Sequence, residues 1–295
     1  MDGFSIRACE LNESDKWTDF LNRNFGYQAP LSYAVDFAPL FSPDALSRSR
    51  LVWKDDKIAS SATLYPTTAI GVDGTLKLGI IGAVATSEEF RGQGLSSRLL
   101  SELEKLAHDS KLDAIMLWSD QREFYAKAGF SAVGRQEIFS LAELPPPDML
   151  VRGTAVYGWD WKQVRALYES HRLRVARTDA YWKTLESIKS CTRIQWMDDT
   201  GRVLAYLGFD RGKDLHGIVH EWGGNAEALH CLLWVVLQNR PNLMWLTHPA
   251  LDDRIRSLLP TSPLSSSTLA LTKIINPAIS SEFFDDVWFW GLDSL

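Results

Sequence analysis

The spacing of apolar residues in the first 140 positions predicts a mixture of strands and helices. Apolar runs bounded by turn signals such as Asp55-Asp56 and Asp73-Gly74 are typical of strands, and apolar residues three or four positions apart are typical of helices. The predicted strands lie at 5–11, 50–54, 57–65, 76–86, 113–118 and 131–139. The predicted helices lie at 15–24, 33–41, 95–108 and 122–128. This order predicts a mixed α/β (α+β) fold with an antiparallel front half.

Three consecutive prolines divide the chain. The segment Leu144-Pro-Pro-Pro-Asp148 lacks three backbone donors and has three fixed φ angles, which is typical of an extended connector. Much of the element order recurs after it. The predicted helices there lie at 161–170, 178–188, 226–238 and 251–259, and the strands at 193–197, 203–209, 216–222, 244–247 and 268–275. We therefore expect two units, residues 1–144 and 151–295, joined by a linker at 145–150.

Size, charge and cysteine content narrow the class of protein. A chain of 295 residues suits two hydrophobic cores better than one. The 37 acidic and 31 basic residues give a net charge of −6, which argues against a nucleic-acid-binding surface. The apolar runs are too short to span a bilayer, the first ten residues do not form a secretory signal, and three widely separated cysteines have no metal-binding spacing. We expect a cytoplasmic protein with reduced, buried thiols, no metal, and no membrane or nucleic-acid partner.

A glycine-rich turn before a predicted helix carries the first chemical signal. The segment Arg91-Gly-Gln-Gly-Leu-Ser96 stands between the strand at 76–86 and the helix at 95–108. The unpaired amides and the dipole of a helix N-terminus attract anions, and glycine lets a phosphate approach the backbone. The segment is neither a Walker sequence nor a G-x-G-x-x-G fingerprint, and alone it also suits a tight connection. Its context is more specific, because a strand and then Phe124-Tyr-Ala-Lys-Ala-Gly-Phe130 follow the helix.

Together these features resemble the GCN5-related N-acetyltransferase (GNAT) superfamily over roughly residues 5–140. Arg91, Gly94 and Ser96 occupy the three positions of that family's Arg/Gln-x-x-Gly-x-Gly/Ala loop, with serine in place of the usual glycine or alanine. Tyr125 begins a match to its later Tyr-x-x-x-Gly-Phe element. The resemblance implies the GNAT fold, a mixed and mostly antiparallel sheet flanked by helices, which takes acetyl-CoA as cosubstrate.

The resemblance also implies which residues bind the cosubstrate. The end of the fourth strand would pair with the pantetheine arm, and the loop amides would bind the pyrophosphate. The residues so implied are Val84, Ala85 and Thr86 for the arm, and Gly92, Gln93, Gly94, Leu95, Ser96 and Ser97 for the pyrophosphate. Arg91 would add charge or hold the loop, and the Ser96 hydroxyl could add a phosphate contact. Asp120 stands where many relatives place an asparagine, which leaves open whether it has the same positioning role.

Tyr125 is the catalytic acid that the resemblance implies. A phenol can protonate the departing CoA thiolate as negative charge builds on sulfur. The alternative for Tyr125 is a packed aromatic side chain between neighbouring phenylalanines. Glu88 and Glu89, just past the fourth strand, are candidates for the base that deprotonates the acceptor, and their alternative is a solvated acidic loop. Asp120 is a further candidate, with turn capping as its alternative.

The second half has no counterpart of the glycine-rich loop. Only Gly223-Gly-Asn225 precedes its helix at 226–238, which predicts a degenerate GNAT-like copy without the cosubstrate site. Such a tandem arrangement resembles the bacterial acetyltransferases of the enhanced-intracellular-survival type. His216 and His220, expected on one face of a strand, lack a third metal ligand at a suitable spacing and are expected as core or cleft residues.

Aromatic residues are concentrated after the prolines. Nine of the 12 tryptophans lie there, and we expect them to form core in preference to the wall of an acceptor groove between the units. The tail at 283–295 contains five large aromatic residues, at positions 283, 284, 288, 289 and 290. Because that much apolar surface is costly to leave in water, the tail is predicted to pack back onto the body.

The sequence therefore favours an N-acetyltransferase that moves an acetyl group from acetyl-CoA to the amine of a small molecule or peptide by direct attack in a ternary complex. The alternative is a non-catalytic acyl-CoA sensor or scaffold that acts through its second half. A transferase that uses aminoacyl-tRNA is disfavoured by the acidic composition. Because acceptor sites are built from variable loops, the acceptor and the oligomeric state stay open.

Overall fold

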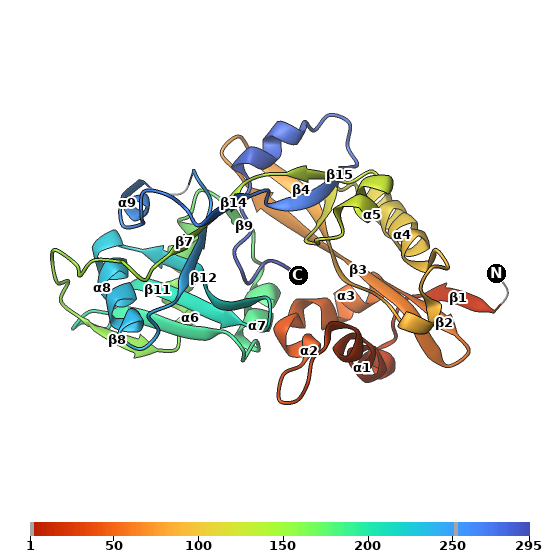
Figure 1. Ribbon diagram of the computed structural model, residues 1–295, viewed down its shortest axis with the longest axis horizontal. Coiled ribbons are helices and arrows are strands. Elements are labelled where there is room, and N and C mark those ends of the chain that lie inside the picture. Colours follow the sequence, from red (N-terminus) through yellow and green to blue (C-terminus); the bar gives the residue numbers. More distant parts are fainter. Residues whose placement is uncertain (1–2, 251–252) are drawn as a thin grey trace.

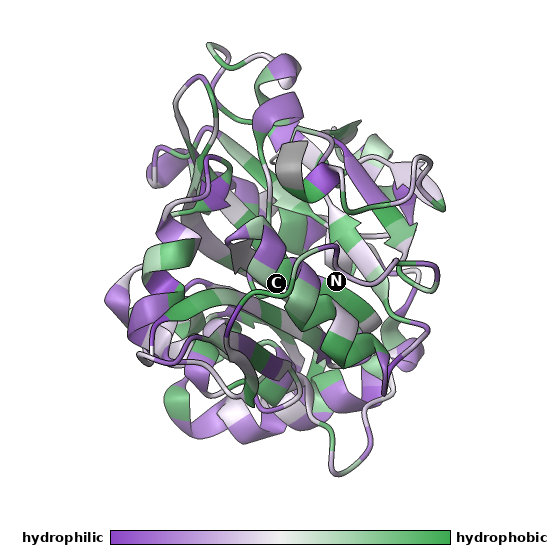
Figure 2. Ribbon diagram, turned by 90° about the vertical axis from the view of Figure 1, so that its left-hand side faces the viewer, coloured by the Kyte–Doolittle hydropathy of each residue, from purple (hydrophilic) through white to green (hydrophobic). Residues whose placement is uncertain are grey.

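Two mixed sheets form the body of the molecule, and Figure 1 shows them side by side with helices around each. The computed structural model describes residues 3–250 and 253–295. Figure 2 shows hydrophobic residues concentrated along the central strands and polar residues on the peripheral helices and loops. This arrangement is the mixed α/β fold with mostly antiparallel sheets that the sequence predicts.

The elements before the prolines follow the predicted order closely. The strands are β1 (Phe4–Arg7), β2 (Ser49–Lys54), β3 (Lys57–Ile70), β4 (Thr75–Thr86), β5 (Ala114–Leu117), β6 (Ser131–Val133) and β7 (Gln136–Ser140). The α-helices are α1 (Ser14–Phe25), α2 (Tyr33–Asp36), α3 (Pro43–Ser47), α4 (Leu95–Asp109) and α5 (Arg122–Lys127). The 3₁₀ helices are η1 (Leu11–Glu13), η2 (Ala38–Phe41) and η3 (Glu88–Phe90).

The elements after the prolines repeat that order in part. The strands are β8 (Thr154–Tyr157), β9 (Arg174–Val175), β10 (Thr192–Met197), β11 (Val203–Arg211), β12 (Leu215–Gly224), β13 (Met244–Thr247), β14 (Ser265–Ser267) and β15 (Ala270–Ile274). The helices are α6 (Trp161–Glu169), α7 (Asp179–Glu186), α8 (Ala226–Leu237), α9 (Asp253–Arg256) and the 3₁₀ helix η4 (Ser281–Asp286). Residues 251 and 252 of the predicted helix at 251–259 lie outside the described residues.

Each sheet is completed by a strand from the other half of the chain. The first sheet has the order β1-β2-β3-β4-β5-β15-β6, with β9 also paired to β3, and the second has the order β14-β7-β13-β12-β11-β10-β8. Two pairs are parallel, β4 with β5 and β12 with β13, and the other pairs are antiparallel. The two units at 1–144 and 151–295 stay a prediction, and the two sheets cross the boundary between them.

The single strand predicted at 131–139 is wrong. It is two strands, because Gly134 adopts a left-handed φ of 67° and turns the chain from the first sheet into the second. A Cβ at Gly134 would lie 2.8 Å from the Leu269 Cβ and 2.9 Å from the Phe284 carbonyl oxygen. Only glycine combines that φ with such close packing, and period-2 patterning does not reveal the break.

The single helix predicted at 33–41 is also interrupted. α2 ends at Asp36, Phe37 has φ −115° and ψ 39°, and the tighter η2 follows. Pro39 contributes to the interruption, because it has no amide to donate to the Val35 carbonyl and so breaks the α-helical hydrogen-bond series. The aromatic side chains nevertheless cluster as the spacing suggests, with the Tyr33 and Phe37 rings 4.4 Å apart.

The two faces of the first sheet pack into different cores. Ile80 on β4 belongs to a large core that continues into the second half, whereas its neighbour Ile81 belongs to a smaller core beneath α4. Successive side chains on a strand point to opposite faces, so α4 lies on the Ile81 face. Its Leu99 and Leu103 are fully buried there, and each burial stabilises the fold by roughly 1.5–3 kcal/mol.

The aromatic tail packs into the large core, as predicted. Trp288 and Trp290 are completely buried, although Phe283 stays exposed. The Trp290 ring lies 5.0 Å from that of Trp222, and its Nε1 donates to the Leu173 carbonyl at 3.2 Å. The buried tryptophans of the second half therefore form core, which confirms the preferred interpretation of the composition.

Three buried charged residues fasten this tail. Arg177 donates to both carboxylate oxygens of Asp293, at 2.8 and 2.9 Å, and to Glu221 Oε1 at 2.7 Å. All three side chains are at most 1% exposed. The Arg177 guanidinium also lies 3.8 Å from the centre of the Tyr168 ring, whose hydroxyl donates to Asp293. We call Arg177, Glu221 and Asp293 the buried ion cluster.

The two histidines of β12 do not share an environment. The His216 side chain is 77% exposed beside Asp210, whereas His220 is fully buried and its Nε2 lies 3.9 Å from the Cys191 sulfur. Gly217 explains the difference, because its φ of 73° interrupts the alternation of the strand. The expectation of one shared strand face is therefore wrong, although His220 is a core residue as expected.

The cysteines are the free, buried residues that the sequence predicts. In the described part of the chain, no helix has the length and apolar content to cross a bilayer.

Glu221→Gln tests the energetics of the buried ion cluster. Burial raises the pKa of Glu221 from its usual 4.5 to about 7, although Arg177 opposes the shift. Between these pH values the unfolded chain loses a proton that the folded chain keeps, so this group's contribution to stability falls as pH rises. Urea unfolding of Glu221→Gln should therefore show a smaller loss of stability between about pH 5 and pH 7 than wild type.

The exposed Glu143→Gln serves as the control and should keep the wild-type dependence on pH. An unchanged slope in Glu221→Gln would contradict the raised pKa.

Candidate functional site

The candidate site lies where β4 and β5 separate. The two parallel strands pair only through residues 78–80 of β4 and 114–116 of β5. β4 continues to Thr86 and remains paired to β3 on its other edge. Within the described residues, no strand pairs with the β5-facing edge of β4 beyond Ile80. Beyond Ile80, that edge of β4 therefore has no neighbouring strand among the described residues to pair with its backbone donors and acceptors.

A bulge shapes β4 at this point. Ala83 has a φ of 53°, and the register between β3 and β4 shifts between Ser61 and Thr63. The Ser61 hydroxyl donates to the Ala83 carbonyl at 2.8 Å, and the Ala83 amide donates to the Tyr33 hydroxyl oxygen at 3.2 Å. A left-handed alanine is costly by about 1–2 kcal/mol, and these two bonds hold it in place. Bulges of this kind redirect a strand beside a site.

The glycine-rich loop leads from this bulge to an uncapped helix. Gly92 and Gly94 have φ values of 77° and 71°, and a Cβ on either would meet no atom within 4 Å. Glycine is required there by backbone conformation, while the adjacent space is open. Gly94 is the N-cap of α4, and no side chain caps the helix or places a carboxylate in its first turn. The first amides of α4 and its dipole can therefore bind an anion.

A chain of hydroxyl groups joins this loop to the sheet. The Thr86 hydroxyl lies 2.8 Å from that of Ser60 and 2.7 Å from that of Ser96. Ser60 also donates to the Ala85 carbonyl at 2.9 Å. The Ser96 hydroxyl thus links the end of β4 to the first turn of α4, and its expected phosphate contact stays a prediction.

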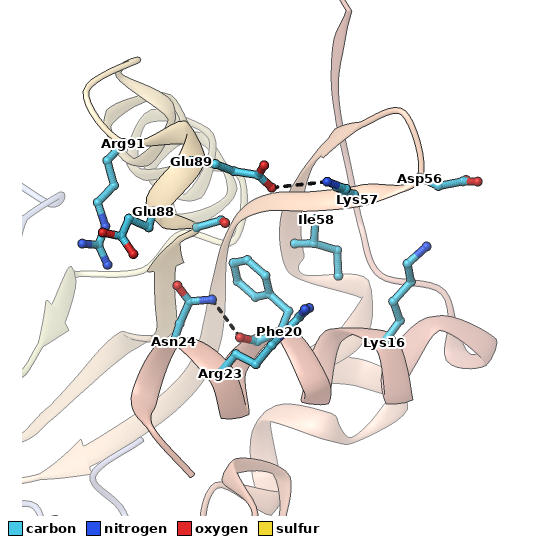
Figure 3. Close-up of a pocket in the computed structure, with 11 residues that line it drawn as sticks. Lys16, Phe20, Arg23, Asn24, Asp56, Lys57, Ile58, Glu88, Glu89 and Arg91 are labelled. Atoms are coloured by element: carbon cyan, nitrogen blue, oxygen red, sulfur yellow. Dashed lines mark hydrogen bonds and ion pairs between the residues drawn. The ribbon is translucent and has the colours of Figure 1, made fainter. Parts of the chain in front are cut away.

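Glu88, Glu89 and Arg91 border a surface pocket of about 390 Å³ on the α1 side of the loop (Figure 3). Its lining residues are Lys16, Phe20, Arg23, Asn24, Asp56, Lys57, Ile58, Ser87, Glu88, Glu89 and Arg91. Glu89 points toward Lys57, at an N–O separation of 3.8 Å. Arg91 Nε donates weakly to the Thr86 carbonyl at 3.5 Å, in keeping with an expected role in holding the loop.

Tyr125 lies on α5 in the smaller core. It is 6% exposed, and its ring lies 5.0 Å from Phe124 and 5.7 Å from Phe130. Burial raises the pKa of Tyr125, and a hydrogen bond with Ser119 opposes that shift. The phenol is therefore protonated at neutral pH. The aromatic packing that the sequence offered as an alternative is present, and it is compatible with proton donation by the hydroxyl.

Asp120 lies exposed in the turn between β5 and α5. Its carbonyl accepts from the Arg122 amide at 2.9 Å, and the neighbouring Ser119 hydroxyl accepts from Gln121 at 3.1 Å. These bonds form the turn before α5. A role of Asp120 in binding stays a prediction.

In the second half, the equivalent helix α8 is capped and the residue before its cap is packed against the chain. The Asn225 side chain accepts from the Ala228 amide at 2.9 Å and so caps α8. A Cβ at Gly224 would lie 2.2 Å from the Leu204 carbonyl oxygen, so no space is open beside the chain. The parallel pair of β12 and β13 is present in this half, but the anion-binding geometry of α4 is not.

Four residues near the site were missed by sequence reasoning. They are Ser60, Ser61, Gly82 and Leu295. The two serines are adjacent polar residues in the apolar part of a strand, which is a signal that could have marked them. The approach of Leu295 to Gly82, where a Cβ would lie 3.2 Å from the Leu295 carbonyl carbon, has no local signal because it joins distant parts of the chain. Within the described ranges, no group of three or more His, Cys, Asp or Glu side chains could hold a metal ion.

Residues 5–133 match the family described as acetyltransferase (GNAT) domain. No curated protein matches the sequence. Among solved structures, a probable N-acyltransferase from Enterococcus faecalis V583 is similar, with a TM-score of 0.67, 17% identity and coverage of 92% of this chain and 73% of that chain.

Two further structures share the fold. A GCN5-related N-acetyltransferase from Kribbella flavida has a TM-score of 0.67 at 14% identity, over 92% of this chain and 71% of that chain. The Saccharomyces cerevisiae N-myristoyltransferase with bound myristoyl-CoA has a TM-score of 0.59 at 10% identity, over 92% of this chain and 79% of that chain. At these identities the likeness concerns the fold. Residues 5–133, which contain the separating β4 and β5 and the open loop at α4, thus match a GNAT acetyltransferase domain, and the solved structures extend the likeness of fold to 92% of the chain.

Proposed function

We propose that the protein transfers an acetyl group from acetyl-CoA to the amine of a small molecule or peptide, by direct attack in a ternary complex. The observation that carries this proposal is the uncapped start of α4. There, two left-handed glycines leave open space directly beside the unpaired edge of β4. A pyrophosphate and an extended arm need these two features next to each other.

The residues of this region would divide the cosubstrate between them. The amides of Gly92, Gln93, Gly94, Leu95, Ser96 and Ser97 would bind the pyrophosphate, with Arg91 adding charge. Val84, Ala85 and Thr86 would pair with the amides of the pantetheine arm. The hydroxyl chain through Thr86 supports this division, because it couples the end of the strand to the start of the helix.

The chemistry would proceed in one displacement. The neutral amine attacks the thioester carbonyl, a C–N bond forms, the C–S bond breaks, and the electron pair leaves on sulfur. The amine proton passes to a base, and the Tyr125 phenol donates a proton to the thiolate. The Tyr125 phenol keeps its proton at neutral pH, so a proton is available when the thiolate forms.

Glu88 and Glu89 remain the proposed bases, with Asp120 as a further candidate. Both glutamates line the pocket beside the loop, and Glu89 Oε1 lies 3.8 Å from Lys57 Nζ. Because neither is buried, each would act on the acceptor through water or after the acceptor closes the pocket. Asp120 would act from the turn before α5.

The second candidate function is a non-catalytic acyl-CoA sensor that acts through the second half. The aromatic packing of Tyr125 favours it, because that packing alone accounts for the residue. The two functions differ in whether bound acetyl-CoA is ever consumed.

Gly94→Ala tests the cosubstrate site. Its methyl group would occupy the open space beside the first amides of α4, so acetyl-CoA should bind about tenfold more weakly by calorimetry. Gly201→Ala is a matched control, because Gly201 has a similar φ of 83° and equally open surroundings in the second half. Both variants should lose about 1–2 kcal/mol of stability from the left-handed alanine. Equal acetyl-CoA affinities in the two variants would contradict the assignment.

Tyr125→Phe tests proton donation. Loss of the hydroxyl should lower kcat for acetyl transfer to a panel of amines by about 100-fold while acetyl-CoA affinity is kept, since general acid catalysis contributes about 10²–10⁴-fold. Tyr157→Phe, at a 74% exposed position on β8, is the control and should turn over like wild type. If Tyr125→Phe also turned over like wild type, Tyr125 would be a packing residue only.

Glu88→Gln and Glu89→Gln test the base. Removing the acting carboxylate should lower kcat by about 100-fold, and the other variant should stay within a few-fold of wild type. Steady-state kinetics with each substrate varied would show this. Full activity in both variants would exclude both residues as the base.

A further inference from the structure

The buried ion cluster has no part in cosubstrate binding as described above, yet burying its charges has a large desolvation cost. Taking charges out of water costs several kcal/mol per ion, and well-packed apolar residues often stabilise a core equally well. Stability alone therefore explains Arg177, Glu221 and Asp293 poorly. Such clusters can instead select one arrangement of the chain, and the bonds around this one point to a particular segment.

The cluster holds residues 291–295, which we call the terminal segment. Besides the fork of Arg177 on Asp293, the Leu292 amide donates to Glu221 Oε1 at 2.9 Å. The Tyr181 hydroxyl donates to the Leu292 carbonyl at 3.2 Å. Around the same turn, Arg211 donates to the Gly291 carbonyl, and the Gly291 amide donates to the His220 carbonyl at 3.0 Å. The Asp293 side chain and the backbone of Gly291 and Leu292 are thus fixed by residues between 177 and 221 of the second half.

Leu295 of the terminal segment lies against β4 of the first half. A Cβ at Gly82 would lie 3.2 Å from the Leu295 carbonyl carbon and 3.3 Å from its oxygen. Gly82 is two residues beyond Ile80, the last β4 residue paired with β5, and precedes the bulged Ala83. Figure 1 shows this end of the chain between the two halves. The segment therefore covers β4 at the point where β5 leaves it.

The terminal segment and α4 lie on opposite faces of the first sheet. Leu295 belongs to the large core with Ile80, whereas Leu95 of α4 belongs to the smaller core with Ile81. The loop that would bind the pyrophosphate is attached to α4. A displaced terminal segment would thus change the face opposite the cosubstrate loop first.

We propose that Arg177 is a positioning residue that holds the terminal segment against β4, where the segment forms a wall for the acceptor amine. This inference rests on the proposed acetyl transfer and deepens it. The second half lacks an open glycine-rich loop at its helix start. Under this proposal, its role is to align the acceptor with the acyl carbon. A displacement of about 1 Å can cost about 100-fold in rate, so a rigid wall matters for the reaction.

Arg177→Lys is the test, because it keeps the charge and removes the fork that grips Asp293 and Glu221 together. We expect the KM for the acceptor amine to rise, or kcat to fall, by about tenfold or more, with the KM for acetyl-CoA within about twofold of wild type. Arg240→Lys is the matched control. Arg240 also forks onto a carboxylate, Asp210, at 2.6 and 3.0 Å, and that pair does not touch the terminal segment.

A second variant covers the case in which Arg177→Lys does not fold. Gly82→Ala places a methyl group against Leu295 and the Leu40 side chain without touching the cluster. The same selective effect on the acceptor is expected. If the folded variants change neither substrate's parameters, or change those for both substrates equally, the positioning role is overturned while acetyl transfer stands. If wild type binds acetyl-CoA but acetylates no amine in the panel, the proposed function fails and this inference fails with it.

Discussion

β15 comes from the last tenth of the chain, yet it lies between β5 and β6 in the first sheet, while β7 leaves the first half to lie between β13 and β14. This exchange of strands constrains everything around it. Neither sheet can complete its hydrogen-bond ladders without the other half of the chain. β15 leaves the chain at the first sheet. From there the aromatic tail enters the large core, which both halves share, and Leu295 reaches Gly82 on β4. The strand topology therefore brings the tail close to β4, and side-chain contacts then fix its exact position.

The two halves use the same parallel strand pair and following helix in opposite ways. In the first half, Gly94 leaves the amides of α4 without a side-chain partner, and the space beside the loop is open. In the second half, Asn225 caps α8 and Gly224 is packed against Leu204. An N-cap asparagine stabilises a helix by about 1 kcal/mol, and the first half forgoes that contribution at α4. The starts of α4 and α8 thus differ in one capping side chain and in whether the space beside the preceding glycine is filled.

Local signals in the sequence predict most of the elements and the glycine-rich turn before α4, because periodicity and glycine conformation act over a few residues. The strand at 244–247 and the start of α4 at Leu95 are confirmed to the residue. The same signals fail where a structural feature depends on residues far apart in the sequence. Alternation tells which face of a strand is buried, but it does not tell which sheet the strand joins, so the break at Gly134 was missed. The contact of Leu295 with Gly82 joins residues more than two hundred positions apart, and no local pattern specifies it.

Hydrophobic burial and ion pairing divide the work of placing the tail. The burial of Trp288 and Trp290 supplies a large favourable free energy, but this contribution is non-directional and would tolerate small shifts along the chain. The planar fork of Arg177 fits only one orientation of the Asp293 carboxylate, and Glu221 accepts a hydrogen bond from the preceding amide, that of Leu292, at the same time. Together these bonds hold the terminal segment in a single register, which hydrophobic burial alone would not specify. A wall beside a reacting group requires that single register, which explains why charged residues occupy a place where apolar ones would pack.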